Sequence, residues 1–199
     1  MEVTVGTGVA AATWNIPKAL LSHHSAYFHI ACHGKFKEAL ENKVKLADCD
    51  PKLFQHFVQW IYFATTPGDL GSEDEIWDAF RLWALGDRLM ATGFKNHMMK
   101  IVHEAHDWED PYSCDFELEE VVWCAKNTTQ DSQLRKWLID TLALHWIHCD
   151  YIEEYKEVWV GALSEYADLL TALLCKMAGM RKDEDDDPET EPVAAYLEK

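Results

Sequence analysis

Residues 16–62 decide the fold, and four short pieces of this stretch carry the information. The pieces are I-P-K-A-L-L-S-H-H-S-A-Y-F from Ile16, G-K-F-K-E-A from Gly34, V-K-L-A-D-C-D-P from Val44 and F-Q-H-F-V-Q-W-I-Y from Phe54. In the first piece, apolar residues are interleaved with Ser and His at spacings that suit a helix with one buried face. Because no Gly or internal Pro interrupts residues 18–32, we predict a single helix there.

The ends of the neighbouring elements also have clear signals. Pro17 suits the first turn of that helix, and Gly34 suits its end. Residues 44–46 have the period of a short strand. Asp50 followed by Pro51 predicts the start of a second helix, because Asp can cap free amides and Pro has the required φ. That helix has a broad apolar face formed by Leu53, Phe54, Phe57, Val58 and Ile61.

The flanking segments extend the same organisation. Residues 3–5 and 12–16 alternate between apolar and polar around a Gly6-Thr7-Gly8 turn, which predicts a hairpin. After Tyr62, a Gly- and Pro-rich loop precedes a helix that Ser72 and Glu75 would cap and Gly93 would close. The next helix is expected from Phe94 to Ala105, followed by a boundary at residues 107–115 and further helices.

Composition excludes several classes of function. The 199 residues are 48% hydrophobic and contain 9 Trp, enough for one substantial core or two small ones. With a net charge of -17 and scattered Lys and Arg, the chain is expected to bind neither nucleic acid nor an anionic membrane. It has no signal-peptide pattern and no segment apolar enough to span a bilayer. The 6 Cys without a C-x-x-C pair are expected as reduced thiols in a cytoplasmic or nuclear protein.

Reactive or metal-binding motifs are not convincing anywhere in the sequence. The pattern H-E-A-H at residues 103–106 lacks the four-residue spacing of a zinc protease helix. The patterns H-x-x-C-H at residues 29–33 and H-x-x-H-C at residues 145–149 have helical spacing, but amphipathic packing explains them better than a zinc site. No nucleophile elbow, phosphate loop or dinucleotide fingerprint is present. We therefore expect no enzyme activity, no metal and no cofactor.

The four pieces, in this order and at these separations, resemble the heart of a BTB/POZ domain of the fungal type, in which the piece from Gly34 is a loop. The run L-W-A-L-G-D-R-L-M-A-T-G-F-K-N, from Leu82, resembles the closing helical pair of that fold. One departure is Pro17, which stands where the family usually has His, so no role of that His is carried over. The resemblance implies an α+β, mostly helical fold in which a small three-stranded sheet is covered by helices and followed by an all-helical extension.

The resemblance and the composition together predict three regions. Residues 1–107 would form the BTB/POZ-like domain, residues 108–180 a helical extension at the position of a BACK-type segment, and residues 181–199 an acidic, disordered tail. The pattern N-T-T-x-x-S-x-L-R-x-x-x-x-D at residues 127–140 is similar to the segment that comes after the domain in fungal relatives. Since the sequence begins at the first strand, the extra helix of strand-exchanged dimers is not seen, and monomer and dimer both remain open.

The function implied is that of a non-catalytic protein-interaction module. It would self-associate or join a substrate to a cullin-type ubiquitin ligase. The alternatives are an elongin-C-like linker and a transcription-associated scaffold that recruits corepressors. Glu2 and Lys18 match a charged pair of dimeric relatives, although an incidental surface pair is equally consistent with the sequence. The residues expected to contact protein partners are Glu2, Lys18, Leu20, Tyr27, Tyr62 and Phe63.

Overall fold

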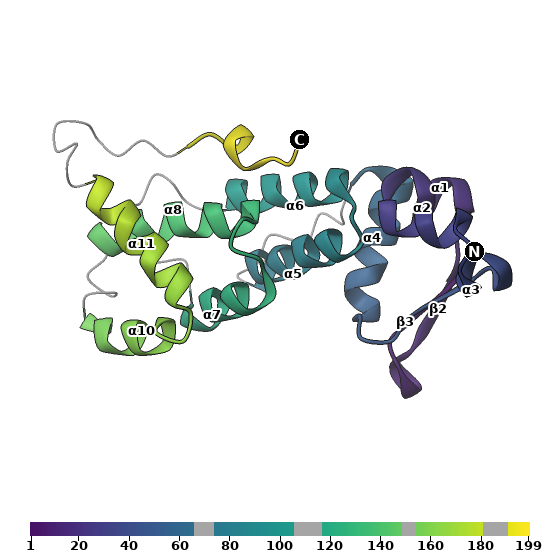
Figure 1. The fold of residues 1–199 in the computed structure, drawn as a ribbon, viewed down its shortest axis with the longest axis horizontal. Coiled ribbons are helices and arrows are strands. Elements are labelled where there is room, and N and C mark those ends of the chain that lie inside the picture. The colour runs from purple at the N-terminus through teal and green to yellow at the C-terminus, as the bar shows by residue number, and fades with distance from the viewer. Residues whose placement is uncertain (66–73, 106–116, 149–153, 181–190) are drawn as a thin grey trace. The chain divides into compact units, whose positions relative to one another are not determined.

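The computed structural model describes residues 1–65, 74–105, 117–148, 154–180 and 191–199 (Figure 1). The chain divides into two compact units, described separately below. The first unit comprises Met1–Val102 with Glu198–Lys199, and the second comprises His103–Leu197. All of the boundary expected at residues 107–115 lies outside the described residues, and so does the cap predicted at Ser72.

Three strands form one sheet in the described part of the first unit. They are β1 (Glu2–Val5), β2 (Ala12–Asn15) and β3 (Lys43–Leu46). The order is β2-β1-β3, with β1 antiparallel to β2 and parallel to β3. Val3 lies opposite Trp14 on one side and Val44 on the other, so the three strands share one sheet, as the resemblance implied. Val3 and Val5 are fully buried because alternate residues of a strand point to the same face.

Six helices accompany this sheet in the described residues: α1 (Lys18–His24), α2 (Ala26–His33), α3 (Lys37–Glu41), α4 (Pro51–Phe63), α5 (Asp74–Arg88) and α6 (Thr92–Ala105). The α+β class with a small sheet and many helices is confirmed. Asp50 caps α4 as predicted, because its Oδ1 accepts a 2.8 Å hydrogen bond from the amide of Lys52.

A chain of aromatic rings forms the centre of the first unit. Trp14 of β2 meets Phe54 of α4 edge-on at 5.1 Å between ring centroids. Phe57, one turn further along α4, lies 6.4 Å from Phe28 of α2 and 5.3 Å from Phe94 of α6. Each such pair adds about 0.5–1.5 kcal/mol beyond the burial of its area. The rings therefore connect the sheet to three helices of this unit.

The prediction of one helix over residues 18–32 is wrong, because the chain breaks at Ser25. Ser25 has extended backbone angles, φ −143° and ψ 120°, and separates α1 from α2. Its Oγ accepts a hydrogen bond from the amide of Phe28 and donates one of 2.5 Å to the carbonyl of Leu89. The buried hydroxyl thus caps α2 and is satisfied by a residue far along the chain.

Two further local predictions need correction. The piece from Gly34, expected as a loop, contains the short helix α3, which ends at Asn42 in the left-handed conformation. Gly93 does not close the preceding helix. It lies inside α6, where an added Cβ would come within 3.1 Å of the Trp60 ring. Gly34 does end α2 as predicted, but its backbone is extended, and a Cβ there would meet the Ile30 carbonyl at 2.5 Å.

The second unit is helical in its described residues: α7 (Leu118–Asn127), α8 (Gln133–His148), α10 (Lys156–Leu163), α11 (Ala167–Met180) and the short 3-10 helix η2 (Val193–Tyr196). Trp137 and Leu142 of α8 and Leu173 of α11 are buried. Trp159 of α10 is buried beside Trp146, with ring centroids 6.0 Å apart. Helices follow the expected boundary, as the sequence indicated.

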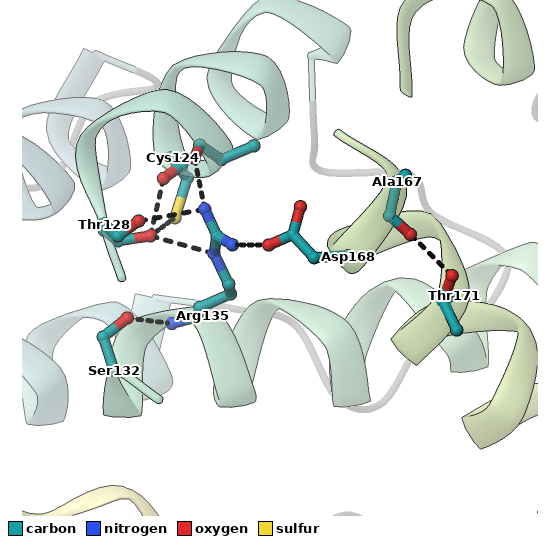
Figure 2. Close-up of polar contacts among 8 residues, drawn as sticks. Cys124, Thr128, Ser132, Arg135, Ala167, Asp168 and Thr171 are labelled. Atoms are coloured by element: carbon teal, nitrogen blue, oxygen red, sulfur yellow. Dashed lines mark hydrogen bonds and ion pairs between the residues drawn. The ribbon is translucent and has the colours of Figure 1, made fainter. Parts of the chain in front are cut away.

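Arg135 of α8 is the most highly connected polar side chain among the described residues of this unit (Figure 2). Only 4% of it is exposed. Its guanidinium donates hydrogen bonds to the carbonyls of Ala125 and Thr128 and to the Thr128 hydroxyl, and it pairs with the carboxylate of Asp168 at the start of α11. Ser132 accepts a hydrogen bond from the Arg135 amide and caps α8. The pattern at residues 127–140 therefore contains the end of α7, the cap of α8 and Arg135, which is hydrogen-bonded to the end of α7.

The tail expected to be disordered includes residues 191–199, and for these the structure differs from the expectation. Tyr196 is 1% exposed and donates a 3.0 Å hydrogen bond to Asp140 in the second unit. In the first unit, Glu198 pairs with Lys95 at 2.9 Å and exchanges two hydrogen bonds with Asn96. Residues 181–190 lie outside the described residues.

Candidate protein-interaction surface

Tyr62 and Phe63 lie at the end of α4 and expose their rings. The exposed fractions are 48% for Tyr62 and 71% for Phe63, and the ring centroids are 6.2 Å apart. Ala64, in the left-handed conformation, ends the helix directly after them. Two adjacent aromatic side chains in water are unfavourable for a free protein and favourable for one that covers them with a partner.

Leu20 and Tyr27, the other apolar residues expected to contact partners, are only half-exposed. Leu20 lies on α1, and Tyr27 lies on α2 with its ring 5.2 Å from that of Phe28. Burial raises the pKa of the Tyr27 hydroxyl, and the negative charge of Glu38 raises it further. Tyr27 thus sits at the edge of the core, close to charged side chains.

A second exposed apolar surface was missed by the sequence analysis. We call it the α3 surface and define it as Ile30, Phe36 and Leu40, of which 49%, 61% and 79% are exposed. Phe36 is the residue directly before α3 and has an extended backbone, and Leu40 lies on α3 four residues later. An added Cβ at Gly34 would touch both the Phe36 ring and the backbone carbonyl of Ile30, so the Phe36 ring lies near the end of α2. A spacing of four within G-K-F-K-E-A-L-E could have suggested this surface.

Charged groups gather near Tyr27. Asp48, just after β3, pairs with Arg88 at the end of α5, with 2.5 Å between Oδ1 and the guanidinium nitrogen. Hydrogen bonding to Arg88 lowers the pKa of the Asp48 carboxyl. The pKa of Tyr27 responds to Glu38, Arg88 and Asp48, so these groups lie near one another. Of these charged residues, Glu38 lies on α3, between the exposed Phe36 and Leu40 in the sequence.

Glu2 and Lys18 are not brought together within the chain. Glu2 lies opposite Lys43 in the sheet, and their side chains form an ion pair of 3.0 Å. Both are substantially exposed, so the pair contributes about 0–1 kcal/mol. Lys18 begins α1. A role for Glu2 and Lys18 between two copies of the chain stays a prediction.

The comparison with known families identifies the domain that the first unit contains. Residues 4–102 match the family model described as the BTB/POZ domain. The chain carries a BTB/POZ domain. No curated protein matches the chain. The matched residues contain most of the sheet, α1 to α5 and most of α6, so both exposed apolar surfaces belong to the BTB/POZ domain, which is a protein-protein interaction module.

Histidines of the BTB/POZ domain gather around α1 and α2. The rings of His29 and His33 lie 5.1 Å apart, and Ser22 is hydrogen-bonded to His33 at 3.3 Å. Within the described residues, no group of three or more His, Cys, Asp or Glu side chains is arranged to hold a metal ion. The side chains of residues 147–149, part of the second pattern considered for zinc, lie outside the description, as does His106. None of the helices described has the length and apolarity needed to cross a membrane.

His24 gives the BTB/POZ domain a testable pH dependence. Burial lowers the pKa of His24 below 6.5, and the neighbouring His23 lowers it further. The ring lies 5.0 Å from the Trp60 ring centroid. A depressed histidine pKa favours the unfolded state at low pH, because the unfolded chain accepts the proton more readily. The contribution of His24 to stability is therefore fully present above pH 6.5, and it is lost as the pH falls through the pKa that His24 has in the folded state. We expect the urea concentration at the midpoint of unfolding to decrease when the pH is lowered from 7.5 to 5.

A matched variant isolates this contribution. His24→Gln cannot take up the proton, so its urea midpoint should fall less over the same pH range than that of the wild type. His33→Gln, which changes an exposed histidine of the next helix, should leave the wild-type pH dependence in place. Equal pH dependence in the wild type and His24→Gln would contradict the assignment.

Proposed function

We propose that this protein is a non-catalytic adaptor that docks its BTB/POZ domain on a cullin-type ubiquitin ligase scaffold and presents a substrate to it. The observation that carries the proposal is the exposure of Phe36 and Leu40 at α3 in a domain whose other aromatic residues are mostly buried. Tyr62 and Phe63 offer a second apolar contact. The cullin as partner, and the fungal type of the domain, rest on the resemblance of residues 16–62.

The chemistry of the described side chains supports a binding role over a catalytic one. Burial raises the pKa of the Cys49 and Cys124 thiols to about 11, so both are protonated near neutral pH and are poor nucleophiles. The net charge of -17 opposes contact with a nucleic acid backbone. A module of this kind needs only surface complementarity. We propose that it acts in the cytoplasm, the nucleus or both.

Affinity measurement with a recombinant cullin tests the proposal. The double variant Phe36→Ala with Leu40→Ala removes the centre of the α3 surface. Truncating interface hot spots costs about 2 kcal/mol or more, so we expect binding to weaken by at least about 30-fold. Isothermal titration calorimetry would measure the dissociation constants. A second pair, Tyr62→Ala with Phe63→Ala, tells whether the end of α4 contributes to the same contact.

Val9→Ala supplies the control, since Val9 is an exposed aliphatic residue of the turn between β1 and β2. It should bind the cullin like the wild type. No measurable affinity of the wild-type protein for any cullin would remove the ligase proposal. If the wild type and the variant Phe36→Ala with Leu40→Ala bind the cullin equally well, the contact lies on another surface.

The molecular mass in solution distinguishes a self-associating module from a monomeric adaptor. Light scattering at micromolar concentration would give twice the chain mass for a self-associating module, and the mass of one chain for a monomeric adaptor. A corepressor scaffold would dimerise and leave the cullin unbound. An elongin-C-like linker would bind both a cullin and a separate substrate receptor.

A further inference from the structure

The C-terminal segment, defined here as residues 191–197, is attached to the second unit mainly through one side chain. Tyr196 is 1% exposed, whereas Glu191, Pro192 and Ala194 are exposed and the remaining residues of the segment are half-buried. A single buried aromatic anchor surrounded by weaker contacts is how short peptides bind a protein surface. The segment contains only one turn of 3-10 helix, which cannot hold its shape alone.

The surface that receives Tyr196 is formed by α8 and neighbouring side chains of the second unit. The Tyr196 hydroxyl donates a 3.0 Å hydrogen bond to Oδ2 of Asp140. Lys136, one turn earlier on α8, lies over the ring at 5.1 Å and donates to the Ala195 carbonyl at 3.4 Å. His103 contacts both ends of the segment. Its ring lies 6.3 Å from that of Tyr196, and its Nε2 is 3.2 Å from the Glu191 carbonyl oxygen.

This receiving surface is fixed by contacts that do not involve the segment. Oδ1 of Asp140 forms a 2.8 Å ion pair with Lys176 of α11, which leaves Oδ2 for the tyrosine. Lys136 and Asp140 are four residues apart on one helix, so their spacing is set by α8. A phenol is recognised by its apolar ring and its hydroxyl together. The Lys136 cation contacts the ring, and the Asp140 carboxylate accepts the hydrogen bond from the hydroxyl. A site whose groups are held in place before binding loses little free energy to ordering.

We propose that the surface around Asp140 and Lys136 is a binding site for a tyrosine-anchored peptide and that the C-terminal segment is its ligand, bound reversibly within the same chain. Release of the segment opens the site, and the same segment supplied as a free peptide refills it. Tethering gives the bound segment an effective concentration on the order of millimolar, so a free peptide competes poorly while the tether's own tyrosine is present.

Peptide binding to the full-length protein tests this inference. The probe is a fluorescein-labelled peptide of residues 191–197, E-P-V-A-A-Y-L. Because it stops at Leu197, it tests the Tyr196 site without the contacts of Glu198. Fluorescence anisotropy should show saturable binding to Tyr196→Ala and at least about tenfold weaker binding to the wild type. The control peptide E-P-V-A-A-A-L should bind neither protein.

A second substitution tests whether the peptide binds at Asp140. Adding Asp140→Asn to Tyr196→Ala should weaken peptide binding by about tenfold, because the hydrogen bond to a charged acceptor becomes one to a neutral acceptor. Circular dichroism checks that the variants are folded. If Tyr196→Ala is not folded, Tyr196→Phe retains the ring, and the peptide should bind it about tenfold better than it binds the wild type. Absence of binding to the folded variants, equal binding to variant and wild type, or no effect of Asp140→Asn would each overturn the proposal.

Discussion

Replacing Arg135 with Met should lower the free energy of unfolding of the second unit by about 3–5 kcal/mol, the range for breaking a buried ion pair by removing one partner. Asp168 would lose its cation, and the carbonyls of Ala125 and Thr128 would lose their donors. Each buried carbonyl without a donor costs about 1–3 kcal/mol. Urea unfolding followed by circular dichroism would measure the loss.

Two control variants separate the effect of the Arg135 charge from the effect of its hydrogen bonds. Lys37→Ala removes the cation of an exposed ion pair with Glu41, 3.5 Å long, and should change stability by no more than about 1 kcal/mol. Arg135→Lys retains a positive charge but has a single donor group in place of the forked guanidinium, so it should recover only part of the loss. Full recovery by Lys would show that charge alone matters and would contradict the role given to the hydrogen-bond network.

Replacing Phe57 with Ala should destabilise the BTB/POZ domain by about 3–5 kcal/mol. Phe57 is fully buried and touches the rings of Phe28, Phe54 and Phe94, so truncation leaves a cavity at the meeting point of three helices. Phe28 and Phe94 belong to α2 and α6, so their rings can close the cavity only if those helices move. The urea midpoint of the variant, compared with that of the wild type, gives the measurement.

Phe63→Ala is the matched control, since it makes the same chemical change six residues later on the same helix. Phe63 is 71% exposed, so its truncation should shift stability by no more than about 0.5 kcal/mol. A large loss of stability in Phe63→Ala would mean that this ring is packed in solution. It would also remove Phe63 from the proposed interaction surface.

The sequence predicted those parts of the fold that depend on neighbouring residues. The three strands follow from alternation around Val3, Trp14 and Val44, and the start of α4 follows from Asp50 and Pro51. Local pattern is sufficient here because burial on one face and a free amide at a helix start are short-range requirements. The mostly helical α+β class was implied by the resemblance of these patterns to a BTB/POZ domain.

The errors arise where a distant residue decides the local structure. Ser25 breaks the first helix because its hydroxyl is bonded to the Leu89 carbonyl, which no pattern near residue 25 reveals. Tyr196 is buried and its hydroxyl donates a hydrogen bond to Asp140 of α8, although the acidic composition led us to predict disorder for residues 181–199. Sequence periodicity reports burial along one element and carries no information about such pairings.

The candidate interaction surface was predicted only in part. Tyr62 and Phe63 were expected and are exposed, but Phe36 and Leu40 were missed. An apolar pair spaced by four usually indicates a buried helix face, and the loop expected from Gly34 offered no helix on which to place the pair. Only coordinates distinguish an apolar face that packs against the core from one that faces water.

The central position of β1 has a consequence for the order in which the BTB/POZ domain acquires its structure. During synthesis β1 leaves the ribosome before both of its neighbours, and β2 comes soon after it, but β3 must be translated after three intervening α-helices before the parallel pairing can form. Pairing between distant segments is slow because the loop must be closed before the pairing contributes. We expect the nascent hairpin to expose the unpaired edge of β1 for that interval, which makes it the segment on which a chaperone would act.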